Sequence, residues 1–591
     1  MCGIAGVLGA GDQRAITEMI AALEHRGPDG AGRRIRSGVH LAAARLAIID
    51  PAAGPQPVSG HGDTAAVVFN GEIYNHGPLR AELRSRGHVF VTGTDTEVVL
   101  HSYEEWGEDC PHHLSGMFAF AVDDGRRVFL ARDRLGIKPL YYAILEGGRR
   151  FAFASEIKAF LRIPGYRPEL DFQAFSDARL IGHPVGDRTY FSGIRKLPPG
   201  HTLIVGYDDG WLDTAQPRPY HRRVPAREPM PYPEAEALLE AALAAAVERH
   251  LAADVEVGLT LSGGLDSTLL ALFAAEQRDT PLRTFTAADH ADHPDVVQAG
   301  HVARLIGGTH HVTLPTFDEF LGAIPAYVAA NEQPSSLHGL PFFLGCRQIA
   351  GHVKACLHGE GADELFGGYS VYLDRARHLR RIRARLATFD GLAARPGPRA
   401  LETVRRLVTA DGFDDYLTEL LDLNLTDQLE RNHLDPVDQC GMAAGLELRV
   451  PYLDDDLVAL TGRLPVGFLV RADLGIRKYI LRRLALRRFG DSVTDVVLRE
   501  KLGVPSSGAR FLARFAGLCD DLLPPSYLAS HPLGAGFATK HALVIFEMFF
   551  ETFFVHRGDP AGIGTVTDFL SGARAGRRSA LAGYGLEEMP A

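Results

Sequence analysis

The segment Ser262-Gly263-Gly264-Leu265-Asp266-Ser267 combines glycines, hydroxyls and a carboxylate in a pattern suited to binding phosphate. It lies between an apolar run over 255–261, typical of a buried strand, and a helical pattern over 268–276. A strand, a tight glycine turn and a helix start surround an anion with backbone N–H groups. The segment lacks the Gly-Lys-Ser/Thr ending of the ordinary P-loop, and Asp266 instead offers a carboxylate that suits Mg²⁺. The simpler alternative is a glycine-rich turn capped by Ser262 and Asp266.

Cys2 is a second position with chemical potential. If Met1 is removed, a thiol and a free α-amine share one residue, and the amine titrates near about pH 7.7–8.0. The amine can then act as the general base for its own thiol. An incidental small residue is the alternative, but the segments that follow have a specific order: Gly3-Ile4-Ala5-Gly6, His25-Arg26-Gly27-Pro28-Asp29-Gly30, Arg45-Leu46-Ala47-Ile48-Ile49-Asp50, Asn70-Gly71-Glu72-Ile73-Tyr74-Asn75, Gly93-Thr94-Asp95-Thr96-Glu97 and residues 132–140.

A third segment, residues 358–369, is dense in glycine and carboxylates. It reads HGEGADELFGGY and follows a strand-like run over 353–357. The glycines suggest a backbone that lies close to a ligand, whereas a solvated acidic loop is the alternative.

The elements around these positions change character along the chain. Short β-branched and aromatic runs alternate with helical patterns up to about residue 200, which predicts an α+β sandwich. Residues 216–233 carry six prolines and predict a linker. Strand and helix patterns then alternate, which predicts a parallel sheet with ligands at the carboxyl ends of its strands. From about Tyr369 onward the pattern is mostly helical.

Bulk composition narrows the class of protein. The chain has 591 residues and a formal net charge of −11, so it suggests two to four domains and gives no electrostatic reason to expect nucleic acid. Six cysteines without pair spacing exclude a disulfide framework and indicate a reducing compartment. The apolar runs are too short to span a membrane, and the first residues lack the basic region of a secretion signal. We therefore expect a cytoplasmic protein.

Together the motifs resemble those of glutamine-hydrolysing asparagine synthetases, from Cys2 to about Pro505. The resemblance implies an α+β N-terminal-nucleophile hydrolase sandwich, followed by an α/β parallel-sheet ATP-pyrophosphatase domain with a largely helical carboxyl-terminal part. It places a type 2 glutamine amidotransferase (glutaminase) domain at residues 2–212, a linker at 213–233 and an asparagine-synthetase-like ATP-dependent domain at 234–591.

The resemblance also implies roles for residues of the glutaminase domain. Cys2 would attack the side-chain amide of glutamine, and Asn70 with the Gly71 N–H would form the oxyanion hole. Arg45, Asp95 and Glu72 would bind glutamine, and Arg26 would lie near the exit for ammonia. Ala43 and Ala44 stand where relatives usually carry His-Arg.

In the synthetase domain, the resemblance implies that Asp266 and Asp363 bind Mg²⁺ and that Glu360 deprotonates ammonia. Lys501 would offset charge on the leaving pyrophosphate. ATP would contact Thr260, Ser262, Gly263, Gly264, Asp266, Ser267, Ala287, His358 and Gly359. The motifs at 445–454 and 477–482 would be mainly helical scaffold. His358 replaces the usual Ser of the family.

The implied reaction is ATP-dependent amidation of a carboxylate with ammonia from glutamine, with aspartate as the expected acceptor. Residues 331–338 and 287–290 depart from the family pattern. These departures support an alternative hypothesis, in which the enzyme amidates a different carboxylate of specialised metabolism. A non-catalytic scaffold that retains the fold is a third alternative. The expected ligands are ATP, Mg²⁺, glutamine and the acceptor, and a homodimer is possible.

Overall fold

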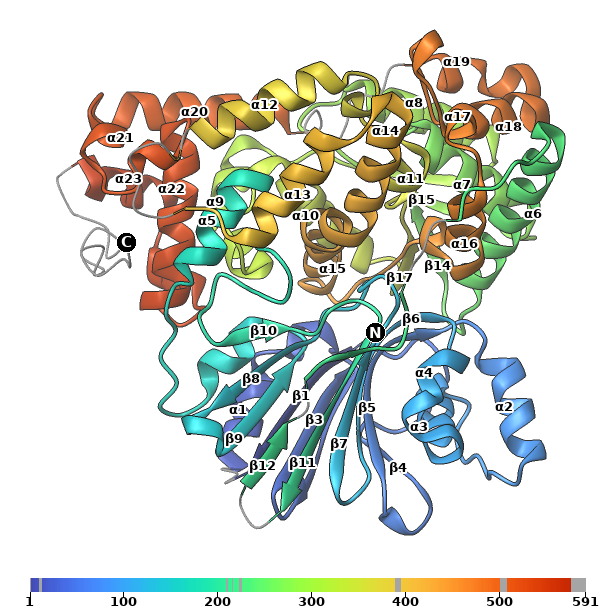
Figure 1. Ribbon diagram of the computed structural model, residues 1–591, viewed down its shortest axis with the longest axis vertical. Coiled ribbons are helices and arrows are strands. Elements are labelled where there is room, and N and C mark those ends of the chain that lie inside the picture. Colours follow the sequence, from blue (N-terminus) through green and yellow to red (C-terminus); the bar gives the residue numbers. More distant parts are fainter. Residues whose placement is uncertain are drawn as a thin grey trace.

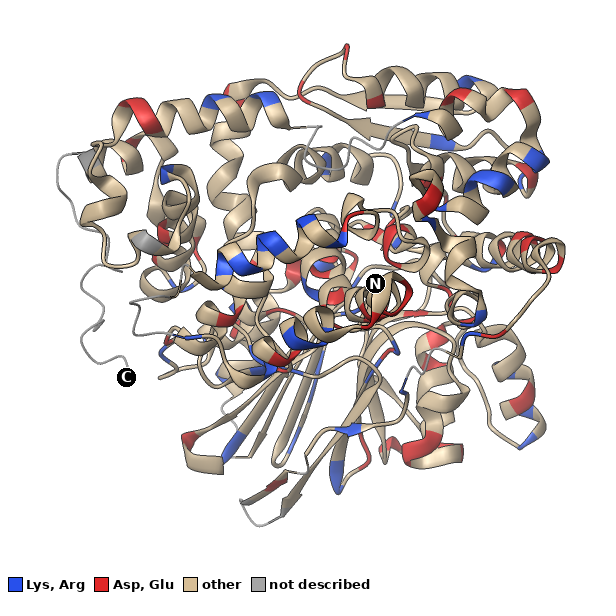
Figure 2. Cartoon of the chain, turned by 45° about the horizontal axis from the view of Figure 1, so that its top comes forward, with Lys and Arg blue, Asp and Glu red and all other residues tan. Residues whose placement is uncertain are grey.

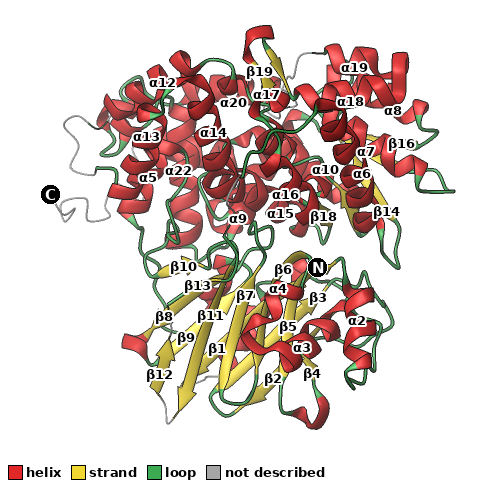
Figure 3. Cartoon of the chain, turned by 45° about the vertical axis from the view of Figure 1, so that its right-hand side comes forward, coloured by secondary structure: helices red, strands yellow, loops and turns green. Residues whose placement is uncertain are grey.

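The computed structural model describes residues 2–9, 13–208, 211–214, 216–222, 226–387, 389, 395–499 and 508–574. Strands dominate the amino-terminal part and helices the remainder (Figures 1 and 3). The α+β and α/β architecture expected from the sequence is confirmed.

Two antiparallel sheets form the amino-terminal part. The first has the order β10 (Ile194–Lys196), β8 (Tyr141–Leu145), β9 (Arg150–Ala154), β1 (Cys2–Gly9), β3 (Val39–Arg45) and β2 (Gly30–Arg36). The second has the order β12 (Trp211–Thr214), β11 (His201–Asp208), β7 (Arg127–Arg132), β6 (Gly116–Asp123), β5 (Ala66–Ile73) and β4 (Val58–Ser59), with β13 (Arg218–Pro219) paired to β11.

The sheets pack face to face because β1 alternates its side chains between two apolar layers. Ile4 and Leu8 join the core between the sheets, whereas Ala5 and Val7 lie in the core on the other face, which also contains residues of α1 (Gln13–Ala21). Helices α2 (His76–Ser85) and α3 (Asp95–Trp106) cover the outer face of the second sheet. The result is a four-layer sandwich of helices, two sheets and helices. The short α4 (Cys110–His113) follows α3, and α5 (Phe172–Ile181) leads towards the helical part.

The third sheet is fully parallel, with the order β16 (Thr309–Thr313), β15 (Arg283–Ala287), β14 (Val257–Thr260), β17 (Ala355–Leu357) and β18 (Glu447–Arg449). The chain leaves β14 towards β15 and returns on its other side at β17. This switch point leaves a crevice outside the carboxyl ends of β14 and β17. The helices of this part are α6 (Tyr232–Leu251), α7 (Leu265–Glu276), α8 (Pro294–Leu305), α9 (Phe317–Asn331), α10 (Leu340–Ala350) and α11 (Ala362–Phe366).

The remaining described residues are mostly helical. They form α12 (Arg375–Ala387), α13 (Pro398–Thr409), α14 (Gly412–Leu423), a π-helix (Asn424–Leu434), α15 (Asp435–Met442), α16 (Asp455–Arg463), α17 (Val466–Leu469), the short strands β19 (Val470–Arg471) and β20 (Ile476–Arg477), α18 (Tyr479–Phe489), α19 (Thr494–Leu498), α20 (Ala509–Leu522), α21 (Tyr527–Ser530), α22 (Lys540–Phe550) and α23 (Val566–Arg574). Within the described ranges, no helix combines the length and apolar character needed to cross a membrane. All six cysteines are buried and unpaired.

Two local expectations need correction. Helix α7 begins at Leu265 rather than at residue 268, so Asp266 and Ser267 belong to its first turn. Residues 447–449, which we expected in a helical scaffold, form the edge strand β18. Glu447 and Arg449 are fully buried in this strand because their side chains pair with each other, so their charges do not mark an exposed face.

Candidate functional site

Cys2 lies at the start of the central strand β1 and is buried. Its backbone N–H donates to Asn70 Oδ1 at 3.1 Å, and Gln56 Nε2 lies 3.3 Å from its Sγ. Burial raises the pKa of the thiol above its usual value. A thiol in this state needs a nearby base to become a nucleophile, and the Cys2 nitrogen would become one only as a free α-amine, after removal of Met1.

Asn70 and Gly71 lie together on β5, next to Cys2. The Asn70 side chain is fully buried, and its Nδ2 has no hydrogen-bond partner. Gly71 admits no side chain, because a Cβ there would lie 2.1 Å from the carbonyl oxygen of Met117. The buried, unused donor of Asn70 beside a thiol is the arrangement that stabilisation of an oxyanion requires.

The three residues expected to bind glutamine have different surroundings. Arg45 pairs with Cys2 in the ladder between β1 and β3, and its guanidinium donates to the carbonyl oxygens of Ile49, Asp50 and Ala53 at 3.1, 2.8 and 2.6 Å. Asp95 begins α3, and its Oδ2 accepts from the N–H of Ile73 at 3.1 Å.

Glu72 differs from Arg45 and Asp95, because its Oε2 lies 2.8 Å from Nη2 of Arg449 on β18. Its carboxylate therefore links the two halves of the molecule. Gln56, which contacts the Cys2 sulfur, was not expected from the sequence, since it belongs to none of the recognised segments.

Arg26 connects the Cys2 strand with the helical part. Its guanidinium is fully buried and reaches Cys2 O at 3.2 Å, Glu156 Oε1 at 2.7 Å and Asp438 Oδ2 on α15 at 2.8 Å. Burial opposes its charge, but the two carboxylates outweigh burial and raise the pKa of Arg26. Figure 2 shows acidic and basic segments side by side where the strands meet the helices. Further ion pairs across this boundary join Lys138 to Asp438, Lys196 to Glu430 and Asp435, and Arg132 to Glu430.

The glycine turn after β14 faces the crevice of the parallel sheet. Gly263 has φ +65°, and a Cβ there would lie 2.6 Å from the backbone nitrogen of Ala299. The turn is closed by Ser262 N–H, which donates to Ser267 Oγ at 3.2 Å. Residues 264–267 thus present the first N–H groups of α7 to the crevice, as a phosphate-binding turn requires. Ala287 ends the neighbouring strand β15.

Asp266 and Asp363 converge on one point, which Lys478 shares. The Nζ of Lys478 lies 2.5 Å from Asp266 Oδ2 and 2.5 Å from Asp363 Oδ1. Asp266 Oδ1 is buried without a hydrogen-bond partner. Two converging carboxylates with an unused oxygen fit the ligand preference of Mg²⁺. We expected the 477–482 motif to be scaffold, but Lys478 lies in the site.

Glu360 lies between two histidines. Its Oε1 is 3.1 Å from His433 Nδ1, and its Oε2 is 3.7 Å from His358 Nε2. Burial would raise the pKa of Glu360, but the hydrogen bonds and charges of the two histidines hold it well below its usual range. The other nitrogen of His358, Nδ1, lies 2.7 Å from Thr260 Oγ1. The lowered pKa keeps the Glu360 carboxylate ionised, and the two histidines hold it in place.

Lys501 and the 331–338 segment, which we expected near the synthetase site, are not placed there by the described residues. Lys501 lies outside the described residues. Glu332, within the 331–338 segment that departs from the family, points to the boundary between the halves, where its carboxylate accepts from the N–H groups of Ile157 and Lys158 at 2.7 Å each. Asn331 Nδ2 donates to Tyr327 O within its own helix.

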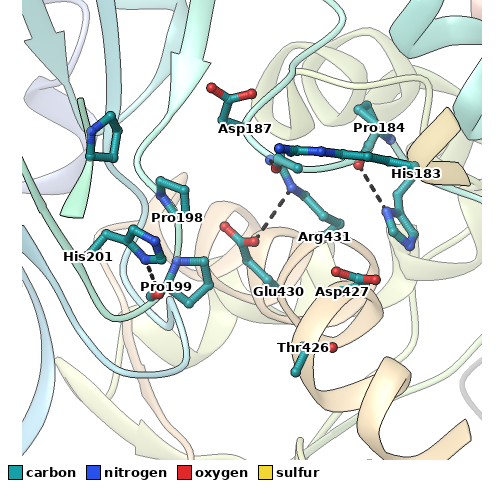
Figure 4. Close-up of a pocket in the computed structure, with 13 residues that line it drawn as sticks. His183, Pro184, Asp187, Pro198, Pro199, His201, Thr426, Asp427, Glu430 and Arg431 are labelled. Atoms are coloured by element: carbon teal, nitrogen blue, oxygen red, sulfur yellow. Dashed lines mark hydrogen bonds and ion pairs between the residues drawn. The ribbon is translucent and has the colours of Figure 1, made fainter. Parts of the chain in front are cut away.

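A cavity of about 360 Å³ also lies at this boundary (Figure 4). Its walls include His183 and Asp187 from the amino-terminal part and Asp427, Glu430 and Arg431 from the π-helix. Burial lowers the pKa of His183 to about 4, so this wall carries a neutral imidazole. The residues expected to do chemistry do not line this cavity, so it is separate from both sites described above.

Comparisons with known proteins match the amino-terminal part and the remainder of the chain to two different families. Residues 1–215 match the glutamine amidotransferase domain family, and residues 238–553 match the asparagine synthase family. A putative glutamine-hydrolysing asparagine synthetase of Mycobacterium tuberculosis is 33% identical over 85% of this chain and 85% of its own length. Glutamine-hydrolysing asparagine synthetases of Bacillus subtilis and Arabidopsis thaliana are 32% and 33% identical, over 79% and 82% of this chain and 81% and 74% of theirs.

Proposed function

Because the chain belongs to the asparagine synthase family and carries a glutamine amidotransferase domain, we propose that it amidates a carboxylate with nitrogen from glutamine at the expense of ATP. The acceptor in this proposal is aspartate and the product asparagine, formed in the cytoplasm. One observation carries the proposal furthest: a buried thiol beside an unused amide donor in one half, and two converging carboxylates beside a fixed base in the other.

In the first reaction, the sulfur of Cys2 attacks the side-chain carbonyl carbon of glutamine. The α-amine of Cys2, freed by removal of Met1, takes the thiol proton and passes it to the departing ammonia. Asn70 Nδ2 and the Gly71 N–H donate to the oxyanion, and water then releases glutamate from the sulfur. Arg45 and Asp95 bind the α-carboxylate and α-amine of the substrate.

Ammonia then moves between the halves inside the protein. Arg26 spans this route, since it contacts the Cys2 carbonyl on one side and Asp438 on the other. A closed passage keeps the ammonia unprotonated and keeps water from the acyl-adenylate.

In the second reaction, an oxygen of the acceptor carboxylate attacks the α-phosphorus of ATP and pyrophosphate leaves. The turn of residues 262–267 holds the phosphates, and Asp266 and Asp363 would hold Mg²⁺, which neutralises charge on the phosphate oxygens. Lys478 lies where its ammonium can donate to the leaving pyrophosphate. Lys501 has the same role in the proposal on the ground of resemblance.

Ammonia finally attacks the acyl carbon, and AMP leaves with the electrons of the broken C–O bond. Glu360 accepts the proton that the nitrogen loses, because its carboxylate is ionised well below neutral pH.

One observation favours an acceptor carboxylate other than aspartate. His358 places an imidazole between Thr260 and Glu360, where the family carries Ser. The 331–338 departure gives less support, because Glu332 faces the other half of the molecule. An acceptor panel tests the choice: the protein is incubated with ATP, Mg²⁺, glutamine and single carboxylic acids, and pyrophosphate and the amide are measured. Aspartate is expected to stimulate both, and no stimulation by aspartate would refute this acceptor.

A further inference from the structure

Three side chains converge on the outer helical layer of the glutaminase part, away from both proposed reactions. His88 lies in the segment after α2, and His101 and Glu104 lie one turn apart on one face of α3. Glu104 Oε2 is 2.7 Å from His101 Nδ1 and 3.6 Å from His88 Nδ1. The three ligand atoms all lie within 4.8 Å of one another, although His88 and His101 are 13 residues apart in sequence.

The opposite ring nitrogens are directed at further carboxylates. His88 Nε2 lies 3.1 Å from Glu105 Oε2, and His101 Nε2 lies 3.6 Å from Glu97 Oε1. His101 is buried, and its Nε2 has no hydrogen-bond partner. Metal-binding histidines characteristically have a carboxylate behind the ring. Glu105 has this position behind His88 within hydrogen-bond distance, and Glu97 lies just beyond hydrogen-bond distance behind His101.

The carboxylates behind the rings are themselves fixed. Glu97 accepts from the N–H groups of Val91 and Thr92 at 2.8 and 2.7 Å, and Glu105 accepts from Arg86 at 2.9 Å. The two imidazole rings lie with their centroids 5.0 Å apart. The rings therefore have little freedom, and the site is arranged before an ion enters.

We propose that His88, His101 and Glu104 bind a divalent transition-metal ion of the zinc type through Nδ1, Nδ1 and Oε2. Ligands at about 2.0–2.1 Å from Zn²⁺ lie about 3.3–3.4 Å apart in a tetrahedron. The two distances to Glu104 Oε2, 2.7 and 3.6 Å, lie near this value, and the two imidazole nitrogens, which lie within 4.8 Å of each other, would move together when the ion binds. Two imidazoles favour Zn²⁺ over Mg²⁺, which prefers oxygen ligands. Glu104 is exposed, so water completes the coordination.

The ion would join the segment 86–92 to α3. Asp95, which begins this helix, belongs to the expected glutamine pocket, and Glu97 in the same turn already holds Val91 and Thr92. The site thus stabilises the position of α3 against the preceding segment. It is independent of the proposed reaction, because its ligands belong to neither expected site.

The test is calorimetric titration of the full-length protein with Zn²⁺ after treatment with a chelator, together with the melting temperature with and without the ion. The wild type is expected to bind at this site and to melt at a higher temperature with Zn²⁺. His88→Gln combined with Glu104→Gln removes two of the three ligands and should weaken binding at this site by more than the roughly 10–100-fold that loss of an outer-shell partner costs. Both positions are at least partly exposed, so this variant should keep its fold.

The control is His301→Gln, which removes an exposed histidine of α8 and should bind like the wild type. Glu105→Gln changes only the carboxylate behind His88 and should weaken binding less than the double variant. The proposal is overturned if the wild type does not bind Zn²⁺, or if the double variant binds with unchanged stoichiometry and affinity. In either case the cluster is an ion-pair network of histidines and glutamates.

Discussion

The ammonium nitrogen of Lys478 lies 2.5 Å from Oδ2 of Asp266, although 212 residues separate them in sequence. Asp363 completes the contact from the other side. The glycine turn of residues 262–267, for which we propose phosphate binding, lies beside this pair, and a cation there can stabilise negative charge as it develops on a leaving group.

We predict that Lys478→Met lowers ATP-dependent amide formation about 100-fold or more with either glutamine or ammonia, since loss of an electrostatic donor has this magnitude. Glutamine hydrolysis should continue, because Cys2 lies in the other half. Pyrophosphate release and glutamate formation report the two reactions separately. Arg471→Gln, which removes an exposed ion pair with Asp473, should change neither. Unchanged pyrophosphate release in Lys478→Met would disprove the role.

Cys2→Ala should abolish glutamine-dependent synthesis while external ammonia still supports it. The substitution removes the nucleophile but leaves the backbone contact to Asn70. Amide formation with each nitrogen source, measured at equal ATP, distinguishes the reactions. If ammonia-dependent synthesis is lost as well, the two sites are not separate.

Much of the parallel sheet could be predicted because short β-branched or apolar runs alternate with helical patterns along this part of the chain. Strand β14 and its turn are the clearest case. Strand β18 could not be predicted in this way, because two of its three residues are charged. Glu447 and Arg449 are buried in compensating pairs that include Glu72, and a pairing across 377 residues leaves no local pattern.

The residues of the two candidate sites also differ in whether they could be predicted from the sequence. Cys2, Asn70, Asp266 and Asp363 lie in recognisable segments, and folding brings each pair together. Lys478 lies just before an ordinary helical pattern, where a lysine usually faces solvent. Its burial depends on tertiary contacts with two acids, which the spacing of residues along the sequence does not encode.

His433→Gln should move the acid limb of the synthetase pH profile upward. His433 is charged at neutral pH: burial lowers its pKa, but the hydrogen bond to Glu360 and the charges of Glu364 and Glu360 outweigh burial and raise the pKa to about 9. Burial raises the pKa of Glu360, but the hydrogen bonds and charges of His358 and His433 together hold it well below its usual range. Without the cation the pKa of Glu360 rises, and the base stays protonated to a higher pH.

The expected shift is about one pH unit, the lower end of the effect of a neighbouring opposite charge. Glutamine-dependent amide formation measured against pH gives the shift. The pH profile of glutamine hydrolysis is the internal control, since Cys2 does not contact this pair. An acid limb that stays in place would show that Glu360 does not limit the rate through its protonation.

Asp438→Asn should weaken both the stability of the protein and the coupling of its two reactions. Asp438 accepts from Arg26 Nη2 at 2.8 Å and Lys138 Nζ at 3.3 Å, and all three side chains are buried. Removing the negative charge leaves two buried cations with less compensation, which costs about 3 kcal/mol of the free energy of unfolding. The denaturant midpoint should fall accordingly. Because Arg26 also holds the Cys2 carbonyl, the passage between the halves should loosen, and more glutamate should form per amide produced.

Asp456→Asn is the matched control, because its side chain is 74% exposed and its pair with Arg249 contributes at most about 1 kcal/mol. An Asp438→Asn protein with the wild-type midpoint and the wild-type ratio of glutamate to amide would show that this buried ion pair neither stabilises the boundary nor couples the sites.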